Sequence, residues 1–412
     1  MKGKWAALIC VVCVLIGLMG FSGWATAQKL PAGEPIKLGA VLPLGDITGA
    51  QAAKAMKLAA KEINLKGGVL GRPIEVIVMD DEMKPATGAT ALDKLATVDK
   101  VDVFIGGMAS GVHLGQIPTL KKYAKVTVWI GAASHKVEEA VGPDSDWYFH
   151  IHPWDYLQGE SYREGWTAIN KKYPHIKIDN WFMAYEEGAF GTASYKMSLD
   201  LYKDWIKIKG ESFKSALLGG GDYRAVLRHA KEANPDVFIW LAYEADAMGF
   251  MVQAKEIGFA PPLFIGSPPG WPAGFGKSPV SEAVTVYGMW APAIKEVSDV
   301  SKHFLEAYTK EYKEEPITYF CPLGYANVYV VAEGIKSAGT VEKAALISAL
   351  KKTEYKSPMG EIITFSPSRI IKNQGIRKQK ILQYQGGEQQ VIWPFEFATS
   401  KPKYPLPGWD KR

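Results

Sequence analysis

The sequence predicts an α/β protein with two doubly wound lobes, each built on a parallel sheet. Short runs of β-branched and aromatic residues alternate with amphipathic stretches of helical period along most of the 412 residues. Glycine, proline and other turn residues follow the strand-like runs, as they do at the carboxyl ends of strands in such folds. The alternation falls into two consecutive series of similar size, which begin near residues 36 and 155.

The first 27 residues are expected to be a signal peptide rather than part of the fold. Lys2 and Lys4 precede an apolar run over 5–21, and Ala25 and Ala27 form a small-x-small cleavage pattern. Cleavage after Ala27 would release the rest of the chain into the periplasm. An uncleaved membrane anchor is the alternative, but the modest length of the run and the cleavage pattern favour removal.

The cysteine content and the charge exclude several classes of protein. Cys10 and Cys13 lie in the expected signal peptide, so the mature chain keeps only Cys321 and cannot form an internal disulfide. The net charge is +5, but no basic cluster interleaves with aromatic residues, and we therefore expect no nucleic-acid surface. No second segment is apolar and long enough to span a bilayer. The expected product is an exported monomer.

The first series predicts a four-stranded half of the fold. Strands are expected at 36–44, 74–79, 101–105 and 126–130, and helices at 48–66, 85–98 and 113–124. In the first helix, Met56, Ala59 and Ile63 recur at helical spacing and give it an apolar face. Because ligands bind beyond the carboxyl ends of parallel strands, the loops at 43–49, 106–111 and 131–135 are expected to gather at a binding edge.

The loop at 106–111 is the most informative turn in the chain. Gly106 and Gly107 let the backbone turn tightly, and Ser110 stands where the N-cap of the next helix is expected. A hydroxyl and free N–H groups at such a corner bind an anion. An ordinary capped helix without a ligand is the alternative.

The second series repeats the pattern, and a longer C-terminal part follows it. Strands are expected at 181–185, 212–217, 237–241 and 263–265, and helices at 154–171, 190–206, 223–233 and 245–257. Beyond these, strands are expected at 284–293, 362–365 and 381–384, and helices at 300–312, 323–338 and 341–350. The aromatic tail at 393–412 is expected to be pinned to a lobe, because large apolar side chains are costly to leave in water.

Several motifs match one known family in the expected order. Asn64 followed by Gly67-Gly-Val-Leu-Gly-Arg72 is the most specific of them. The other matching pieces are 36–44, 60–64, Asp80-Asp81 with Pro85, 105–111, 185–191, Asp222-Tyr223, 254–258 and 265–266. Over most of its length the chain resembles the periplasmic solute-binding proteins of the branched-chain amino-acid (Leu/Ile/Val-type) ABC transporter class, which have the type I periplasmic-binding fold.

The resemblance implies two lobes joined by a hinge of three crossover strands, expected near 150–155, 289–293 and 358–365. Lobe 1 is then 28–153 with 292–360, and lobe 2 is 154–291 with 361–412. A solute would bind in the cleft, hinge closure would trap it, and the protein would deliver it to the permease subunits of an ABC importer. A sensor component that reports the same class of solute to a receptor is the alternative.

The resemblance also assigns the ligand-binding residues. In the family, a serine after the third strand and an Ala-Thr pair after the fourth hold the ligand carboxylate, and these match Ser110, Ala133 and Ser134. Hydroxyls and free N–H groups at two helix starts can neutralise an anion without a buried lysine. From lobe 2 the family contributes two aromatic residues, which match Phe190 and Tyr243 and would give the cleft shape and dryness.

One departure from the family concerns the ligand's ammonium group. The family's amino-acid binders pair it with a glutamate in the loop that here is Ser267-Pro-Pro-Gly-Trp-Pro272, without an acid. Asp46, Glu187 or Glu244 could substitute, although none matches the position. Trp271 in that loop, with Phe190 and Tyr243, could instead enclose a ring or branched acyl chain.

The sequence therefore leaves the ligand open between two kinds of carboxylate. A hydrophobic or aromatic acid competes with a branched-chain amino acid, because a buried ammonium needs a partner.

Enzymatic and metal chemistry are weighed against this interpretation and are not favoured. Ser110 lies near His113 and Ser134 precedes His135, but no G-x-S-x-G elbow occurs. His150 and His152 could ligate a metal with His135, yet alternate residues of a strand share a face for packing as well. Without a G-x-G-x-x-G motif, a dinucleotide enzyme is also disfavoured, and we expect no cofactor.

Overall fold

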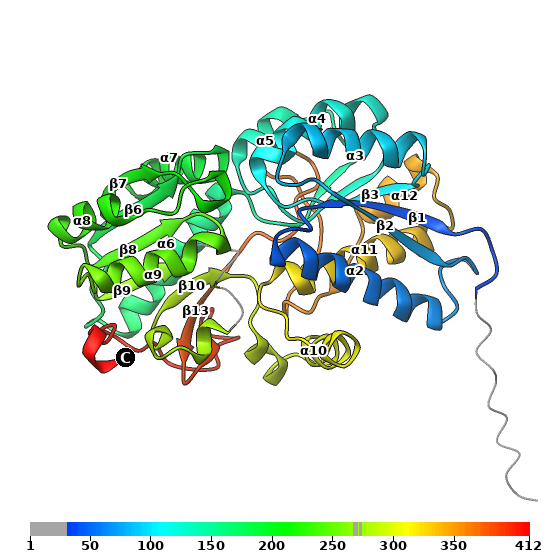
Figure 1. Ribbon diagram of the computed structural model, residues 1–412. Helices are drawn as coiled ribbons and strands as arrows, with labels where there is room; N and C mark the ends of the chain where they lie inside the picture. The colour runs from blue at the N-terminus through cyan, green and yellow to red at the C-terminus, as the bar shows by residue number, and fades with distance from the viewer. Residues whose placement is uncertain (1–30, 267–270, 272–273) are drawn as a thin grey trace, which may run out of the picture.

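The computed structural model describes residues 31–266, 271 and 274–412. The expected signal peptide and its cleavage site after Ala27 lie outside the described residues, as does most of the loop 267–272. The remainder confirms the predicted α/β class, with two lobes that lie side by side and each contain a twisted sheet between helices (Figure 1). None of the helices in the described part of the chain is long and apolar enough to cross a membrane.

The first lobe is built on five parallel strands in the order β2-β1-β3-β4-β5. The strands are β1 (Ile36–Leu42), β2 (Ile74–Asp80), β3 (Val103–Gly106), β4 (Thr127–Trp129) and β5 (Tyr148–His150). The helices are α2 (Ile47–Leu65), α3 (Pro85–Thr97), α4 (Ser110–Tyr123), α5 (His135–Val141), α10 (Asp299–Tyr312), α11 (Phe320–Ala338) and α12 (Lys343–Leu350). α3 packs on α4 on one side of the sheet, and α2 packs on α11 on the other (Figure 1). The central strand β3 is fully buried, as expected for a strand covered on both faces.

The second lobe is built on a sheet in the order β14-β13-β10-β9-β8-β6-β7. The strands are β6 (Asn180–Glu186), β7 (Lys207–Phe213), β8 (Val237–Leu241), β9 (Leu263–Gly266), β10 (Thr285–Gly288), β13 (Lys380–Gln385) and β14 (Glu388–Trp393). The helices are α6 (Asp155–Lys172), α7 (Ala189–Tyr202), α8 (Arg224–Ala233) and α9 (Glu244–Glu256). The strands from β10 to β7 are parallel, while β13 and β14 add an antiparallel edge. The sequence did not predict β14.

The chain passes between the lobes three times. The first two passages follow β5 and β10, near 150–155 and 288–292, as expected. The third was expected at 358–365, and this expectation is wrong. Residues 373–376 still pair with His150 and Ile151 at the edge of the first lobe, and the chain enters the second sheet only at β13. The segment before β13 pairs through isolated bridges, which leave no alternating pattern in the sequence.

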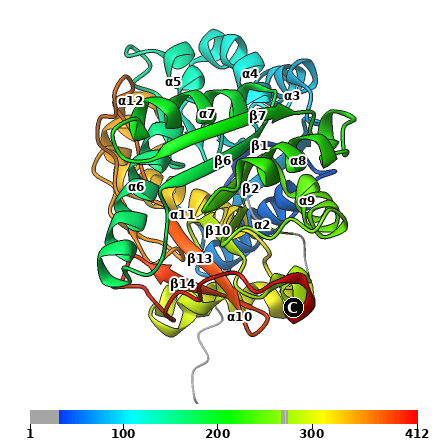
Figure 2. The ribbon, with the colours of Figure 1, turned by 90° about the vertical axis from the view of Figure 1, so that its left-hand side faces the viewer.

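The C-terminal tail lies on the second lobe, as predicted (Figures 1 and 2). The Leu406 N–H donates to the Pro262 carbonyl at 2.8 Å, and the Trp409 indole N–H donates to the Phe259 carbonyl at 3.0 Å. Leu406 itself is buried. These contacts fix the tail beside the beginning of β9.

Candidate functional site

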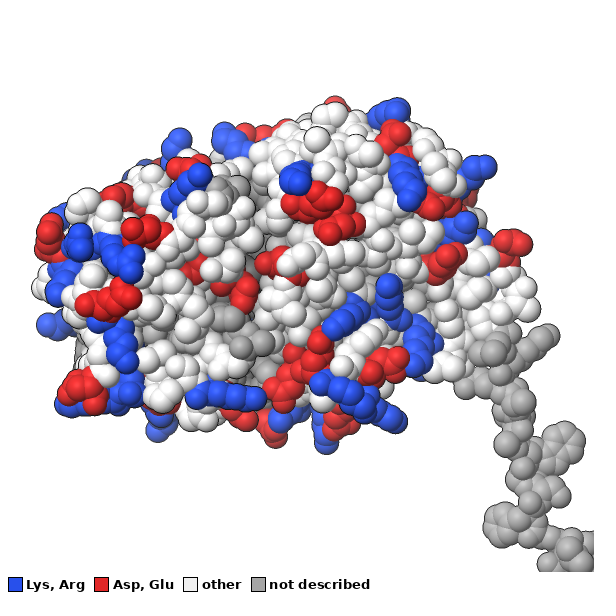
Figure 3. Space-filling model, viewed as in Figure 1, with Lys and Arg blue, Asp and Glu red and all other residues white. Residues whose placement is uncertain are grey.

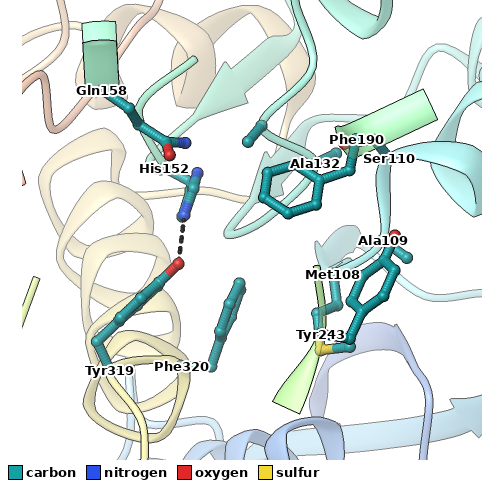
Figure 4. A pocket seen from close by; sticks show the side chains of 11 residues that line it. Met108, Ala109, Ser110, Ala132, His152, Gln158, Phe190, Tyr243, Tyr319 and Phe320 are labelled. Atoms are coloured by element: carbon teal, nitrogen blue, oxygen red, sulfur yellow. Dashed lines mark hydrogen bonds between the residues drawn. The ribbon is translucent and has the colours of Figure 1, made fainter. Parts of the chain in front are cut away.

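A cavity lies between the two lobes (Figure 4). Its lining residues come from the loops after β3 and β4, the first crossover, and the first turns of α4, α6, α7, α9 and α11. They are Met108, Ala109, Ser110, Ala132, Ala133, His152, Gln158, Phe190, Tyr243, Tyr319 and Phe320. Four of the residues singled out from the sequence, Ser110, Ala133, Phe190 and Tyr243, are therefore brought together.

Ser110 stands at one end of this cavity, in a corner that only glycine can form. Gly106 and Gly107 have φ values of 97° and 81°, and a Cβ on Gly107 would lie 1.7 Å from Nε1 of Trp129. Ser110 is the first residue of α4, so the expectation that it is the N-cap is wrong, and Ala109 holds that position. The Ser110 hydroxyl therefore does not cap α4.

Ser134 lies behind Ser110 rather than on the cavity wall. Its backbone N–H donates to the Ser110 hydroxyl at 3.1 Å, and its own hydroxyl caps α5 by accepting the Lys136 N–H at 3.3 Å. The side chain of Ser134 is fully buried, whereas Ala132 and Ala133 face the cavity. The first residue of α4 and the N-cap of α5 are thus linked through the Ser110 hydroxyl.

Two aromatic side chains of the second lobe form the opposite wall. Phe190 is the second residue of α7, whose first turn is held by the buried carboxylate of Glu186 through the Gly191 N–H at 2.6 Å. Tyr243 is the N-cap of α9, and its N–H donates to the Asp246 carboxylate at 3.2 Å. The two rings lie with their centroids 5.9 Å apart. The carboxylates of Glu186 and Asp246 therefore hold the backbone that carries Phe190 and Tyr243, and neither carboxylate lines the cavity.

The hinge end of the cavity carries a neutral polar group, His152, which the sequence singled out only as a possible metal ligand. Nδ1 of His152 lies 2.9 Å from the Pro153 carbonyl, which can only accept, so this nitrogen carries the hydrogen. Nε2 then accepts from the Tyr319 hydroxyl at 2.9 Å (Figure 4). Burial, together with the neighbouring His150, lowers the pKa of His152 to about 3 and keeps the ring uncharged. The Gln158 amide also donates to the Pro153 carbonyl, at 2.9 Å.

Met108, Tyr319 and Phe320 were also missed. Tyr319 and Phe320 lie at the start of α11, whose helical pattern was recognised only from residue 323 onward. No local signal in the sequence connects them with Ser110, because they reach the cavity only when α11 packs beneath the first sheet.

Trp271 is not part of this cavity, contrary to its expected role. Its side chain is fully buried, stacks on Phe275 at 4.2 Å and meets Trp240 edge-on at 5.4 Å. It lines a separate hollow between the lobes, together with Phe275 and Tyr384. The residues around it, 267–270 and 272–273, lie outside the described part of the chain.

The acidic residues considered as ammonium partners lie outside the cavity lining. Asp46 caps α2, where its carboxylate accepts the Thr48 N–H at 2.8 Å. Glu244 begins α9, and burial, with smaller contributions from Asp46 and Asp246, raises its pKa to about 7. Glu187 is exposed. Among the described residues, none of those that line the cavity carries a carboxylate.

The histidines considered for a metal site are each occupied in other ways. His135 Nδ1 contacts the Asp155 carboxylate at 2.8 Å, and this hydrogen bond raises the pKa of His135 despite partial burial. His150 contacts the Gly131 carbonyl and the Gln374 side chain. Over the described residues, no three histidine, cysteine or acidic side chains are grouped as metal ligands.

The surface of the two lobes carries mixed charge. On the face shown in Figure 3, lysines and arginines are interspersed with aspartates and glutamates on both lobes. This face offers no extended basic surface of the kind that binds a nucleic-acid backbone.

Comparison with known proteins gives one consistent family. The model of a family described as periplasmic binding protein matches residues 35–388. A "Leu/Ile/Val-binding protein homolog 7" of Brucella abortus is 24% identical over 410 residues, covering 92% of this chain and 96% of the relative.

Two solved structures illustrate the range of ligands among similar folds. The branched-chain amino acid transporter substrate binding protein LivJ of Streptococcus pneumoniae, in complex with isoleucine, has a TM-score of 0.71 and 21% identity, and the match covers 90% of this chain and all of the other (100%). A solute binding protein of an ABC transporter from R. palustris, in complex with benzoate, has a TM-score of 0.73 and 16% identity over 87% and 95% of the two chains.

Proposed function

The chain belongs to the periplasmic binding protein family, and from that premise we propose that it traps a small carboxylate between its lobes and delivers it to the permease of an ABC importer. The family implies a periplasmic location, and the relatives that match are solute-binding proteins rather than enzymes. Removal of a signal peptide after Ala27 is part of the proposal.

The observation that carries the proposal is the composition of the cavity between the lobes. One end presents the Ser110 hydroxyl and the start of α4, which suit a carboxylate. The walls are aromatic and come from both lobes, so a bound ring or acyl chain would lose contact with water only when the lobes are together. Ser134 supports the carboxylate end by orienting the Ser110 hydroxyl through its backbone N–H.

A hydrophobic or aromatic acid suits this cavity better than an α-amino acid. A buried ammonium group without a partner is costly, and the described lining residues supply no carboxylate to pair with it. Asp46 and Glu244 lie outside the lining, and the loop 267–272 has no acidic residue in its sequence. Single-ring acids such as the benzoate bound by the R. palustris protein are therefore the favoured ligands.

A thermal-shift screen of the mature chain tests this function. Benzoate, phenylacetate, leucine and isoleucine are compared at equal concentration, because a ligand that binds only the folded state raises the melting temperature. We expect the two aromatic acids to raise it and the two amino acids to have little effect. A rise with leucine and isoleucine alone would contradict the aromatic ligand, and no rise with any small carboxylate would contradict the carboxylate site itself.

A further inference from the structure

His150, the last residue of β5, is buried at the hinge and faces an oxygen atom at each of its ring nitrogens. Nε2 lies 2.6 Å from the Gly131 carbonyl, and Nδ1 lies 3.2 Å from Oε1 of Gln374. A carbonyl oxygen accepts hydrogen bonds and cannot donate one, whereas a neutral imidazole carries a hydrogen on only one of its nitrogens. In the neutral form, one ring nitrogen of His150 therefore presents a lone pair to an oxygen.

The orientation of the Gln374 amide is fixed by its other contacts. Its Nε2 donates to the His152 carbonyl at 3.0 Å and to the Ile376 carbonyl at 2.9 Å, which uses both of its hydrogens. Turning the amide over would relieve His150 but would place Oε1 against those two carbonyls. All of these contacts are favourable together only when both nitrogens of His150 carry a hydrogen, and the ring is then a cation.

The rings around His150 can stabilise a cation but carry no charge themselves. The indole of Trp154 stacks on His150 with the ring centroids 3.7 Å apart, and an aromatic face attracts a cation. Burial lowers the pKa values of His113 and His152 to about 3, so both are neutral. Burial also raises the pKa of Tyr148 well above its ordinary value of 10.

The carboxylates of the neighbouring helices are engaged with other partners. Glu138 on α5 accepts from the Tyr156 hydroxyl at 3.0 Å, and Asp155 on α6 contacts His135 at 2.8 Å. Among the described residues, no carboxylate forms a hydrogen bond with the His150 ring. Burial accordingly lowers the pKa of His150 to about 4, although its two oxygen contacts act in the opposite direction. A charged His150 would need a counter-charge from elsewhere.

The cavity between the lobes lies next to this histidine. Gly131, whose carbonyl contacts His150, immediately precedes Ala132 and Ala133 in the cavity wall. The ring of His152 also lines the cavity, and its centroid is 6.3 Å from that of His150. Opposite charges attract strongly where water is excluded, so an anion in the cavity can act as the missing counter-charge.

We propose that His150 takes up a proton when a carboxylate binds in the cavity, so that the buried imidazolium offsets the ligand's charge through the loop after β4. The proton completes the hydrogen bonds to Gly131 and Gln374, and the ligand at Ser110 supplies the negative charge. This inference rests on the proposed function and adds a coupling between ligand and proton.

Calorimetry of the mature protein with benzoate tests the coupling. Titrations at about pH 6.5 in two buffers of different ionisation enthalpy count the protons bound, and we expect at least about 0.3 per benzoate. By linkage, the affinity should be at least about threefold higher at about pH 5.5 than at about pH 8, a range over which benzoate stays ionised. Binding that is independent of buffer and pH would overturn the proposal while leaving the carboxylate site intact. Failure of benzoate to bind would count against the proposed function and this inference together.

Nitrogen NMR of histidine-labelled protein identifies the group without a variant. We expect His150 to carry a hydrogen on one ring nitrogen in the free protein and on both after benzoate is added. The same protonation in the free and bound protein would overturn the proposal.

Two histidine variants locate the proton by calorimetry. His150→Gln should abolish the dependence of affinity on pH, because a glutamine side chain stays neutral. His135→Gln is the matched control, since His135 follows the same loop and has a raised pKa, and it should retain the dependence. Loss of the dependence in His135→Gln alone would assign the proton to His135 and overturn the proposal. The NMR measurement decides if His150→Gln does not fold.

Discussion

The Ser110 hydroxyl accepts a hydrogen bond from the backbone N–H of Ser134 at 3.1 Å, which links the first residue of α4 to the cap of α5. An oxygen that accepts from a fixed N–H directs its own hydrogen elsewhere, and Ser110 lines the cavity between the lobes. The contact therefore orients the hydroxyl before any ligand arrives. Preorganisation of this kind improves affinity because less freedom is lost on binding.

Replacing Ser110 by alanine should weaken the binding of a carboxylate about tenfold or more, since a hydrogen bond to a charged group contributes about 1.5–3 kcal/mol. The change also leaves the Ser134 N–H without its partner, so the melting temperature should fall. Ser145→Ala is the matched control, because Ser145 is also buried and donates to the Val141 carbonyl at 2.8 Å but lies outside the cavity lining. Calorimetry should show normal affinity for the control, and equal weakening in both variants would contradict a direct role of Ser110.

Trp271→Ala should lower stability without changing ligand affinity. Its ring is fully buried against Phe275 and Trp240, and deleting such a side chain costs about 3–5 kcal/mol. Tyr243→Ala should mainly lower the affinity for the ligand, because Tyr243 lines the cavity. Chemical denaturation and calorimetry of the two variants separate the effects, and a specific loss of affinity in Trp271→Ala would restore its expected place in the site.

The His135–Asp155 pair makes stability depend on pH across the first crossover. The hydrogen bond to Asp155 raises the pKa of His135 above its ordinary value of 6.5 in the folded state. The folded chain then binds a proton more tightly than the unfolded chain, so the contribution is complete below about pH 6.5 and is lost as the pH rises through the raised pKa.

His135→Gln should therefore lower the melting temperature more at about pH 5.5 than at about pH 9. His229→Gln, which removes an exposed histidine paired with Glu211, is the control and should have a smaller effect. A difference between His135→Gln and the unmodified protein that does not vary with pH would contradict a charged pair.

Glu244 is also expected to make stability fall as the pH rises, over a lower pH range. Burial, followed by the charges of Asp46 and Asp246, raises its pKa from 4.5 to about 7 in the folded state. The folded chain keeps a proton that the unfolded chain releases, so the free energy of unfolding falls as the pH rises between about 4.5 and 7.

Glu244→Gln removes this penalty. At about pH 8 the melting temperature should rise by about 2–4 °C, and at about pH 4 it should change little. Glu187→Gln, at an exposed carboxylate, is the control and should be neutral at both pH values. A destabilised Glu244→Gln at the higher pH would show that the carboxylate has a favourable partner instead.

The sequence, together with the resemblance to a known family, was sufficient to predict four residues after strands that line the cavity between the lobes. Ser110, Ala133, Phe190 and Tyr243 come directly after β3, β4, β6 and β8, and the carboxyl ends of parallel strands meet at one edge of each sheet. This rule needs only the order of the elements. It therefore works without knowledge of how the two lobes are placed relative to each other.

The hinge side of the cavity could not be predicted in the same way. His152 lies on the first crossover and Tyr319 begins α11, and the two are 167 positions apart in the sequence although their side chains are hydrogen-bonded. Trp271 was misplaced for a related reason, since an aromatic residue in a loop packs inward as readily as it lines a cleft. Long-range packing decides both cases.

The most direct test of the account is calorimetry of the mature protein with benzoate and with leucine, each repeated on Ser110→Ala. The account predicts binding of benzoate with one site per chain, an affinity about tenfold weaker in Ser110→Ala, and little or no heat with leucine. Tight binding of leucine without any response to benzoate or other aromatic acids would contradict it.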